Sequence, residues 1–250
     1  MLGAALAGLT LLAVSACRQP PEPPRGVDEN PPVEDIVEET VEAAPETVRV
    51  LLQTDWLVVT EIHLAAGGEI ALHREGERAV FAHNAHTLRL SPLSGEGSAT
   101  SRSFRAGQAG LLPAGPLDLE AAGAREARLV VVNRSSQPLP PEAGAGPGLA
   151  GAAGARELLR DGPVRVSALT LDGGASHEIR DAPLEAVYVL GPGSLRISGG
   201  GAARSNTASE PGASEPVTLL PGQALGLVGR STAANPGGAP TRLVVFRFER

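Results

Sequence analysis

The feature that most constrains the fold of this chain is an internal repeat. Four blocks recur in the same order, about 110 residues apart. The paired blocks are RAVFAHNAHTLRL (78–90) and EAVYVLGPGSLRI (185–197), GQAGLLPAG (107–115) and GQALGLVGR (222–230), RLVVV (128–132) and RLVVF (242–246), and LAAGG (64–68) and TLDGG (170–174). Such a repeat indicates a structural unit that occurs twice. We therefore expect two copies of one fold in tandem.

Each repeated block has the composition of a short strand that ends at Gly, Pro or Asn. The chain contains 31 glycines and 22 prolines, residue types that interrupt strands and form turns. This pattern predicts an all-β protein made of two sandwich-like or barrel-like halves. The expected halves are residues 48–134 and 164–250, joined by a connector over residues 135–163 in which residues 156–160 form one helical turn. Residues 199–216 are polar and glycine-rich, and we expect a mobile loop there.

The N-terminal segment consists of an apolar run followed by the single cysteine of the chain. Residues 2–14 form an uncharged apolar run, which is too short to span a bilayer as a helix but suits the core of a signal peptide. The run continues into AVSAC (13–17), which is similar to a lipobox, where small residues precede a cysteine that receives a diacylglycerol. We expect residues 1–16 to be the signal peptide and Cys17, the single cysteine, to be the lipidation site. The alternative is a buried N-terminal helix with an incidental cysteine.

Residues 17–47 are expected to form a disordered, acidic, proline-rich linker between the lipid anchor and the folded halves. They hold most of the acidic surplus behind the net charge of −7, so the rest of the chain is nearly neutral. No basic stripe indicates nucleic-acid binding. The expected partners are the membrane, through the lipidated cysteine, and an unknown small molecule or protein. The expected location is the bacterial cell envelope, at the outer membrane or the periplasmic face in a Gram-negative cell.

Two spacings in the first half are similar to those of the cupin superfamily. Gly67 is followed after five residues by His73, and Gly107 is followed after five residues by Pro113 and then by Gly115. The second half keeps motif residues at Gly173, Glu185, Gly222 and Gly229. The chain therefore resembles a double cupin over both halves. The resemblance implies two jelly-roll barrels (double-stranded β-helices) that form a bicupin after the signal peptide and linker.

The resemblance also implies which residues stand where a cupin holds its metal. Cupins bind manganese, iron, zinc or a related ion with three histidines and one glutamate that face into the barrel. The corresponding residues of the first half are His73, Glu75, Arg78 and Asp118. Those of the second half are Ile179, Asp181, Glu185 and Ala233. Five of the six histidines are thus replaced, and we expect the metal site of the second half to be lost.

Three interpretations of the first-half residues remain open. His73, Glu75 and Asp118 could hold a divalent transition metal with one position left for water. Against this stands the permanent charge of Arg78, which disfavours a nearby cation. The second interpretation is a metal-free ion-pair cluster in which Arg78 satisfies both carboxylates, and the third is contact with an unknown ligand. We expect the ion-pair cluster and no cofactor.

Other polar residues give weaker signals. Asp181 and Glu185 are candidates for a pocket in the second barrel. His83 and His86 lie in a stretch that aligns with a turn of the second half. We expect these two histidines to be exposed turn residues, although their spacing could also chelate a surface ion.

The residues favour a binding protein over an enzyme. We expect a lipid-anchored, cell-envelope double cupin that binds a small molecule or a protein without catalysis. The alternative is a metal-dependent envelope enzyme of the oxygenase or isomerase type that uses the residual site of the first barrel. A third interpretation is a purely structural role as a spacer or assembly subunit. The sequence shows no Ser–His–Asp arrangement, phosphate-binding glycine loop or CxxC pair that would indicate other chemistry.

Overall fold

The computed structural model describes residues 47–95, 97–199, 202–203 and 216–249. The expected signal peptide, Cys17, nearly all of the expected linker and most of the expected loop at 199–216 lie outside the described residues. The described residues form strands and turns and contain no helix, which confirms the all-β prediction. In this part of the chain there is accordingly no helix with the length and apolar character needed to cross a membrane.

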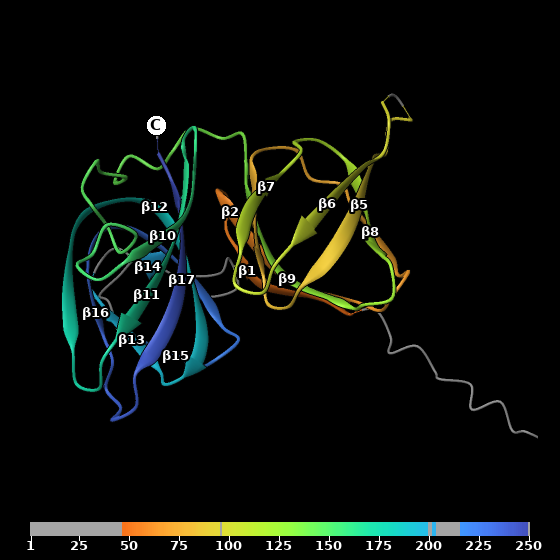
Figure 1. Ribbon diagram of the computed structural model, residues 1–250. Coiled ribbons are helices and arrows are strands. Elements are labelled where there is room, and N and C mark those ends of the chain that lie inside the picture. Colours follow the sequence, from red (N-terminus) through yellow and green to blue (C-terminus); the bar gives the residue numbers. More distant parts are fainter. Residues whose placement is uncertain (1–46, 96, 200–201, 204–215, 250) are drawn as a thin grey trace, which may run out of the picture. The chain divides into compact units, whose positions relative to one another are not determined.

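The first half forms two sheets (Figure 1). Its strands are β1 (Thr47–Gln53), β2 (Leu57–Leu64), β3 (Glu69–Leu72), β4 (Arg78–Ala82), β5 (His86–Pro92), β6 (Thr100–Phe104), β7 (Ala109–Leu112), β8 (Leu117–Ala122) and β9 (Ala127–Arg134). A five-stranded sheet has the order β1-β2-β9-β4-β7, and a four-stranded sheet has the order β3-β8-β5-β6. Apolar residues at every second position, such as Leu117 and Leu119 of β8, are buried in a core enclosed by the two sheets.

The second half forms one continuous sheet that curves around its own core. Its strands are β10 (Arg156–Asp161), β11 (Val164–Leu171), β12 (Ser176–Pro192), β13 (Leu195–Ser198), β14 (Ala202–Ala203), β15 (Val217–Leu219), β16 (Ala224–Ala234) and β17 (Thr241–Phe248). The strand order is β10-β11-β17-β12-β16-β13-β15, with β14 paired to β16. The long strand β12 pairs with both β16 and β17, so it links the two walls around the core.

The internal repeat is visible in the hydrogen bonds of one turn. The N–H of Gly107 donates to the carbonyl of Ala82 over 2.8 Å, and the N–H of Gly222 donates to the carbonyl of Val189 over 2.8 Å. Ala82 and Val189 occupy equivalent positions of the aligned blocks. Both glycines have positive φ, 76° and 78°, a conformation that glycine adopts without steric cost. The sequence repeat therefore reflects two copies of one structural unit.

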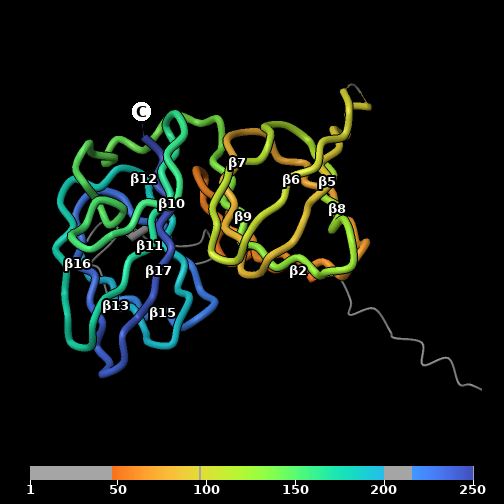
Figure 2. The backbone as a smooth tube through the Cα atoms, viewed as in Figure 1, coloured from red at the N-terminus to blue at the C-terminus, as the bar shows by residue number. Residues whose placement is uncertain are grey.

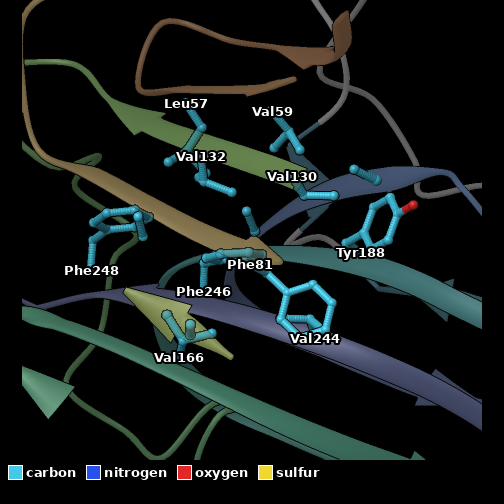
Figure 3. Packing of buried hydrophobic residues seen from close by; sticks show 14 of the residues in the cluster. Leu57, Val59, Phe81, Val130, Val132, Val166, Tyr188, Val244, Phe246 and Phe248 are labelled. Carbon is cyan, nitrogen blue, oxygen red and sulfur yellow. The ribbon is translucent and has the colours of Figure 1, made fainter. Parts of the chain in front are cut away.

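A third hydrophobic core joins the two halves (Figure 3). The five-stranded sheet of the first half contributes Leu57, Val59, Phe81, Val130 and Val132. The second half contributes Val166, Tyr188, Val244, Phe246 and Phe248. Because successive residues of a strand point to opposite faces, each of these strands supplies one set of side chains to its own barrel and the other set to this shared core.

Residues 156–160 form part of β10 rather than the expected helical turn. β10 pairs with β11 in an antiparallel hairpin in which Asp161 lies opposite Val164. Gly162, between them, has a φ of 52°, which suits a tight hairpin turn. Leu158 packs against the core between the halves. This burial favours a strand. The sheet of the second half therefore begins within the predicted connector, residues 135–163.

Candidate functional site

The first barrel contains a cavity of about 240 Å³. Its apolar lining residues are Val48, Val50, Val58, Ile70, Ala71, Leu72 and Val131. Its polar lining residues are Thr60, His73, Arg74, Arg78 and Asn133. Val48 and Val50, on β1, are 48 % and 55 % exposed, so the cavity has an apolar rim. Apolar walls with a few polar groups are the usual composition of a small-molecule site.

The pairing of β2 with β9 explains how two of the polar groups reach the cavity. Val58 lies opposite Asn133, and Thr60 lies opposite Val131. Residues that oppose each other in an antiparallel pair point to the same face. These four side chains therefore form one wall, in which each polar residue lies opposite a valine.

Asn133 carries an unused hydrogen-bond acceptor. The residue is 8 % exposed, and its Nδ2 donates to the carbonyl of Glu75 over 3.4 Å. Its Oδ1 is buried and has no hydrogen-bond partner among the described residues. A buried polar atom without a partner costs about 1–3 kcal/mol of stability. A bound donor in the cavity would remove that cost.

Arg78 is held by backbone carbonyls. Its side chain is buried, with 2 % exposure. The guanidinium donates to the carbonyls of Pro113 over 3.1 Å and Gly115 over 2.9 Å, and also to that of Arg74. Burial lowers the pKa of Arg78, but an arginine keeps its charge at neutral pH. Arg78, the first residue of β4, therefore holds the turn after β7 and the turn after β3 in place.

The predicted ligand residues of the first half do not converge. His73 is exposed and lies at the cavity, whereas Glu75 is exposed and lines a neighbouring pocket. Asp118 lies between the buried residues Leu117 and Leu119 of β8, so it points to the outer face of its sheet. The salt bridges among the described residues include none from Arg78 to either carboxylate, because backbone carbonyls satisfy its guanidinium instead.

The predicted pocket residues of the second half are also separated. Asp181 is exposed, has a φ of 48°, and lies 3.8 Å from Arg230. Glu185 is fully buried. Its carboxylate accepts hydrogen bonds from the backbone N–H groups of Leu149 over 2.8 Å and Ala150 over 3.0 Å. Burial raises the pKa of Glu185 to about 7, although the two N–H groups and two nearby arginines, Arg247 and Arg165, act in the opposite direction.

The connector contributes side chains to the core of the second barrel. Figure 2 shows its path, in green, from β9 to the side of β12 before it enters β10. The N–H groups of Gly144 and Gly146 donate to carbonyls of β12 over 3.0 Å and 2.7 Å. Leu149 and Ala152 then belong to the same core as Ile179 and other barrel residues. At Gly148, a Cβ would lie 2.2 Å from Glu185 Oε1, so glycine allows the connector to approach the carboxylate.

His83 and His86 are not exposed turn residues, contrary to expectation. His86 begins β5 and is 5 % exposed, with Nδ1 3.0 Å from the carbonyl of Asn84. His83 is partly buried and meets the ring of Phe81 edge-on, with the ring centroids 5.5 Å apart. Burial lowers the pKa of both histidines. The expectation failed for His86 because β5 starts within the stretch that was aligned to a turn, and for His83 because its ring packs against Phe81 and Tyr188.

The described residues do not form a cupin-type metal site. They contain no group of three or more His, Cys, Asp or Glu side chains placed to hold a metal ion. At the metal positions of the second half, Ile179 and Ala233 are buried in the core. The polar residues that line the cavity of the first barrel include Asn133, Thr60, His73 and Arg78. These side chains suit hydrogen bonding to an organic ligand better than cation binding.

Asn133 and Thr60 were not predicted from the sequence. The signal for Asn133 is a polar residue that follows an apolar strand, RLVVV, in step with the inward-facing Leu129 and Val131. The same period-two pattern marks Thr60 before Ile62 and Leu64. The cupin motif does not draw attention to either position.

No family model and no curated protein matches the sequence. Solved structures do match. A cupin 2 conserved barrel domain protein from Leptotrichia buccalis is 11% identical, with a TM-score of 0.45 over 84% of this chain and 92% of that chain. A variant of oxalate decarboxylase from Bacillus subtilis is 11% identical, with a TM-score of 0.53 over 78% of this chain and 69% of that one.

A second structure of the Bacillus subtilis oxalate decarboxylase, one that concerns its Mn(II) centres, is 11% identical to this chain. Its TM-score is 0.54 over 82% of this chain and 75% of that one. The match spans both halves, and at this identity it shows the fold alone. Together with the two sheets of the first half, the curved sheet of the second and the shared turn, it establishes that the described residues have the cupin fold in its two-barrel form.

Proposed function

We propose that this protein is a lipid-anchored protein of the bacterial cell envelope that binds a small organic molecule in the cavity of its first barrel, without catalysis. The observation that carries the proposal is that Asn133, whose buried Oδ1 has no partner among the described residues, lines a cavity with apolar walls. Such a site selects a ligand with an apolar body and one hydrogen-bond donor. Since buried side chains of the strands and of the connector occupy the core of the second barrel, the first barrel is the better candidate.

Support for a binding role over an enzymatic one comes from the residues that reach the cavity. A metal-dependent enzyme needs at least three ligands around one ion, and His73, Glu75 and Asp118 do not meet. Metal-free acid–base chemistry needs a nucleophile and a base within hydrogen-bond reach. No hydrogen bond joins His73 to Thr60 or Asn133 among the described residues. The lining therefore favours recognition of a ligand.

The proposed location rests on the sequence before the described residues. An apolar run, the lipobox-like AVSAC and an acidic linker occur in the order of a lipoprotein N-terminus. Two acyl chains on Cys17 would anchor the protein stably, where one chain anchors only marginally. The linker would then hold the binding barrel away from the lipid surface.

Indole and benzothiophene test the proposed site. The two molecules have nearly the same shape, but only indole has an N–H that Asn133 Oδ1 can accept. Titration calorimetry of the full chain should show indole binding about tenfold more tightly, the value expected for one hydrogen bond to a buried acceptor. Asn133→Leu should abolish this preference because it removes the acceptor and keeps the branched shape of the side chain.

Gln137→Leu is the matched control, because it removes an amide at an exposed connector position. It should leave the preference for indole unchanged. If Asn133→Leu retains the preference, the ligand does not bind against Asn133 and the proposed site is wrong. If neither molecule binds the wild-type protein, the cavity is not a binding site for compounds of this kind.

A further inference from the structure

A second cavity, of about 560 Å³, lies between the two halves. The first half borders it with Phe81 and His83, and the second half borders it with residues of β10, β11, β12 and β17. This cavity is separate from the one in the first barrel, since the two share no lining residue. It lies beyond the edge of the shared core, on the faces that the halves turn toward each other.

Strand register brings two arginines to one face of this cavity. Arg156 of β10 lies opposite Ala168 of β11, and Arg242 of β17 lies opposite Thr170 of β11. Ala168 and Thr170 are two positions apart on β11, so they point to the same face. The two arginines therefore flank β11 on that face, and only small side chains lie between them.

Neither arginine is neutralised by a carboxylate within the described structure. Glu157, the acid next to Arg156 in the chain, pairs instead with Arg160 over 3.2 Å and Arg165 over 2.8 Å. Arg242 donates from Nε to the carbonyl of Gly191 over 3.3 Å, which leaves its two terminal nitrogens available. No aspartate or glutamate lines the cavity. Two unpaired guanidinium groups in a partly enclosed space favour an anion.

Apolar side chains from both halves also line the cavity. Phe81, Leu158 and Leu190 line the cavity and also pack against the shared core, so their positions are fixed by burial. His83 also lines the cavity, and its buried Nε2 has no hydrogen-bond partner in the part of the chain that the structure describes. The lining thus combines a cationic end, an apolar surface and one further polar atom.

We infer that this cavity binds an organic carboxylate with an apolar chain. The carboxylate would lie between Arg156 and Arg242, and the chain would lie against Phe81, Leu158 and Leu190. A planar carboxylate can accept paired hydrogen bonds from guanidinium groups, while burial of each methylene on the apolar wall adds affinity. Two sites of different chemistry, one in the first barrel and one between the barrels, then exist in the same protein.

Titration calorimetry of the full chain with octanoate tests the inference. Octanoate should bind, octan-1-ol should bind at least tenfold more weakly, and affinity should rise by about fourfold per methylene from butyrate to octanoate. Arg156→Gln and Arg242→Gln should each weaken octanoate binding by about tenfold. Arg160→Gln on the same strand β10 and Arg196→Gln on β13 lie outside the cavity and should change it by less than twofold.

Three outcomes would overturn the inference. If Arg160→Gln and Arg196→Gln weaken octanoate binding as much as the cavity variants do, the binding reflects general electrostatic attraction. If octan-1-ol binds as tightly as octanoate, the arginines do not recognise the carboxylate. Loss of octanoate binding on Asn133→Leu, with no effect of Arg156→Gln or Arg242→Gln, would assign octanoate to the first barrel. The urea unfolding midpoints of Arg156→Gln and Arg242→Gln should match that of the wild type, which separates loss of binding from loss of fold.

Discussion

Glu185 accepts a hydrogen bond of 2.8 Å from the backbone N–H of Leu149, and this contact attaches the connector to the interior of the second barrel. Leu149, Ala150 and Ala152 of the connector belong to the core of this barrel. The carboxylate is fully buried, and the free energy of holding it there depends on its protonation.

The buried carboxylate makes stability depend on pH. Burial raises the pKa of Glu185 from 4.5 to about 7, so the folded protein binds this proton more tightly than the unfolded chain. Its contribution to stability is complete below about pH 4.5 and is lost as pH rises through 7. We predict that the free energy of unfolding falls by on the order of 2 kcal/mol from pH 5 to pH 8 because of this group. Urea unfolding at the two pH values measures it.

Glu185→Gln should remove most of this pH dependence, because glutamine does not ionise. Glu178→Gln, at an exposed position of the same strand, should keep the wild-type dependence. An unchanged slope in Glu185→Gln would show that another group causes the effect.

Leu149 should contribute strongly to stability. Its side chain is fully buried in the core of the second barrel, so truncation loses packing and leaves a cavity. We predict that Leu149→Ala lowers the free energy of unfolding by about 2–4 kcal/mol. Leu220→Ala, at a position that is 56 % exposed, should change it by less than about 0.5 kcal/mol. Equal effects of the two substitutions in urea unfolding would contradict the placement of Leu149 in this core.

Arg78 should act through the backbone and not through carboxylates. We predict that Arg78→Met lowers the free energy of unfolding by about 2–4 kcal/mol, because it leaves the carbonyls of Pro113 and Gly115 without their donor. A double-mutant cycle with Asp118→Asn should give a coupling energy below about 0.5 kcal/mol. A coupling above about 1 kcal/mol would restore the ion-pair cluster predicted from the sequence.

Cys17 should be the lipid acceptor. We predict that Cys17→Ala abolishes labelling with radioactive palmitate and releases the protein from the membrane fraction, because the chain has no other cysteine. Ser15→Ala, which keeps a small residue before the cysteine, should still be labelled. Continued labelling of Cys17→Ala would exclude the lipoprotein interpretation.

The fold could be predicted from the sequence because the same turn occurs in both halves at positions where the backbone requires glycine. Gly107 and Gly222 make the same hydrogen bond in the two halves, and the positive φ at each position tolerates few other residues. The turn positions therefore remained similar, and the two-barrel cupin prediction is confirmed by solved structures with TM-scores of 0.53 and 0.54.

The candidate site could be predicted less well from the sequence, for two physical reasons. First, the direction of a side chain depends on the pleat: Asp118 follows Leu117 in a regular strand and so points outward, which a motif spacing does not reveal. Second, backbone carbonyls satisfy Arg78, and the sequence does not show where free carbonyls lie. The contribution of Leu149 to the core of the second barrel was missed because the connector's composition is that of a loop.

The shared core between the barrels has a consequence for how the chain is made. During synthesis the first half emerges first, and the apolar face that carries Phe81 and Val130 has no counterpart at that stage. Phe246 and Phe248, which cover it, follow the first half in the chain. Until they are synthesised, this apolar face of the sheet stays exposed, and an incomplete chain can aggregate through it.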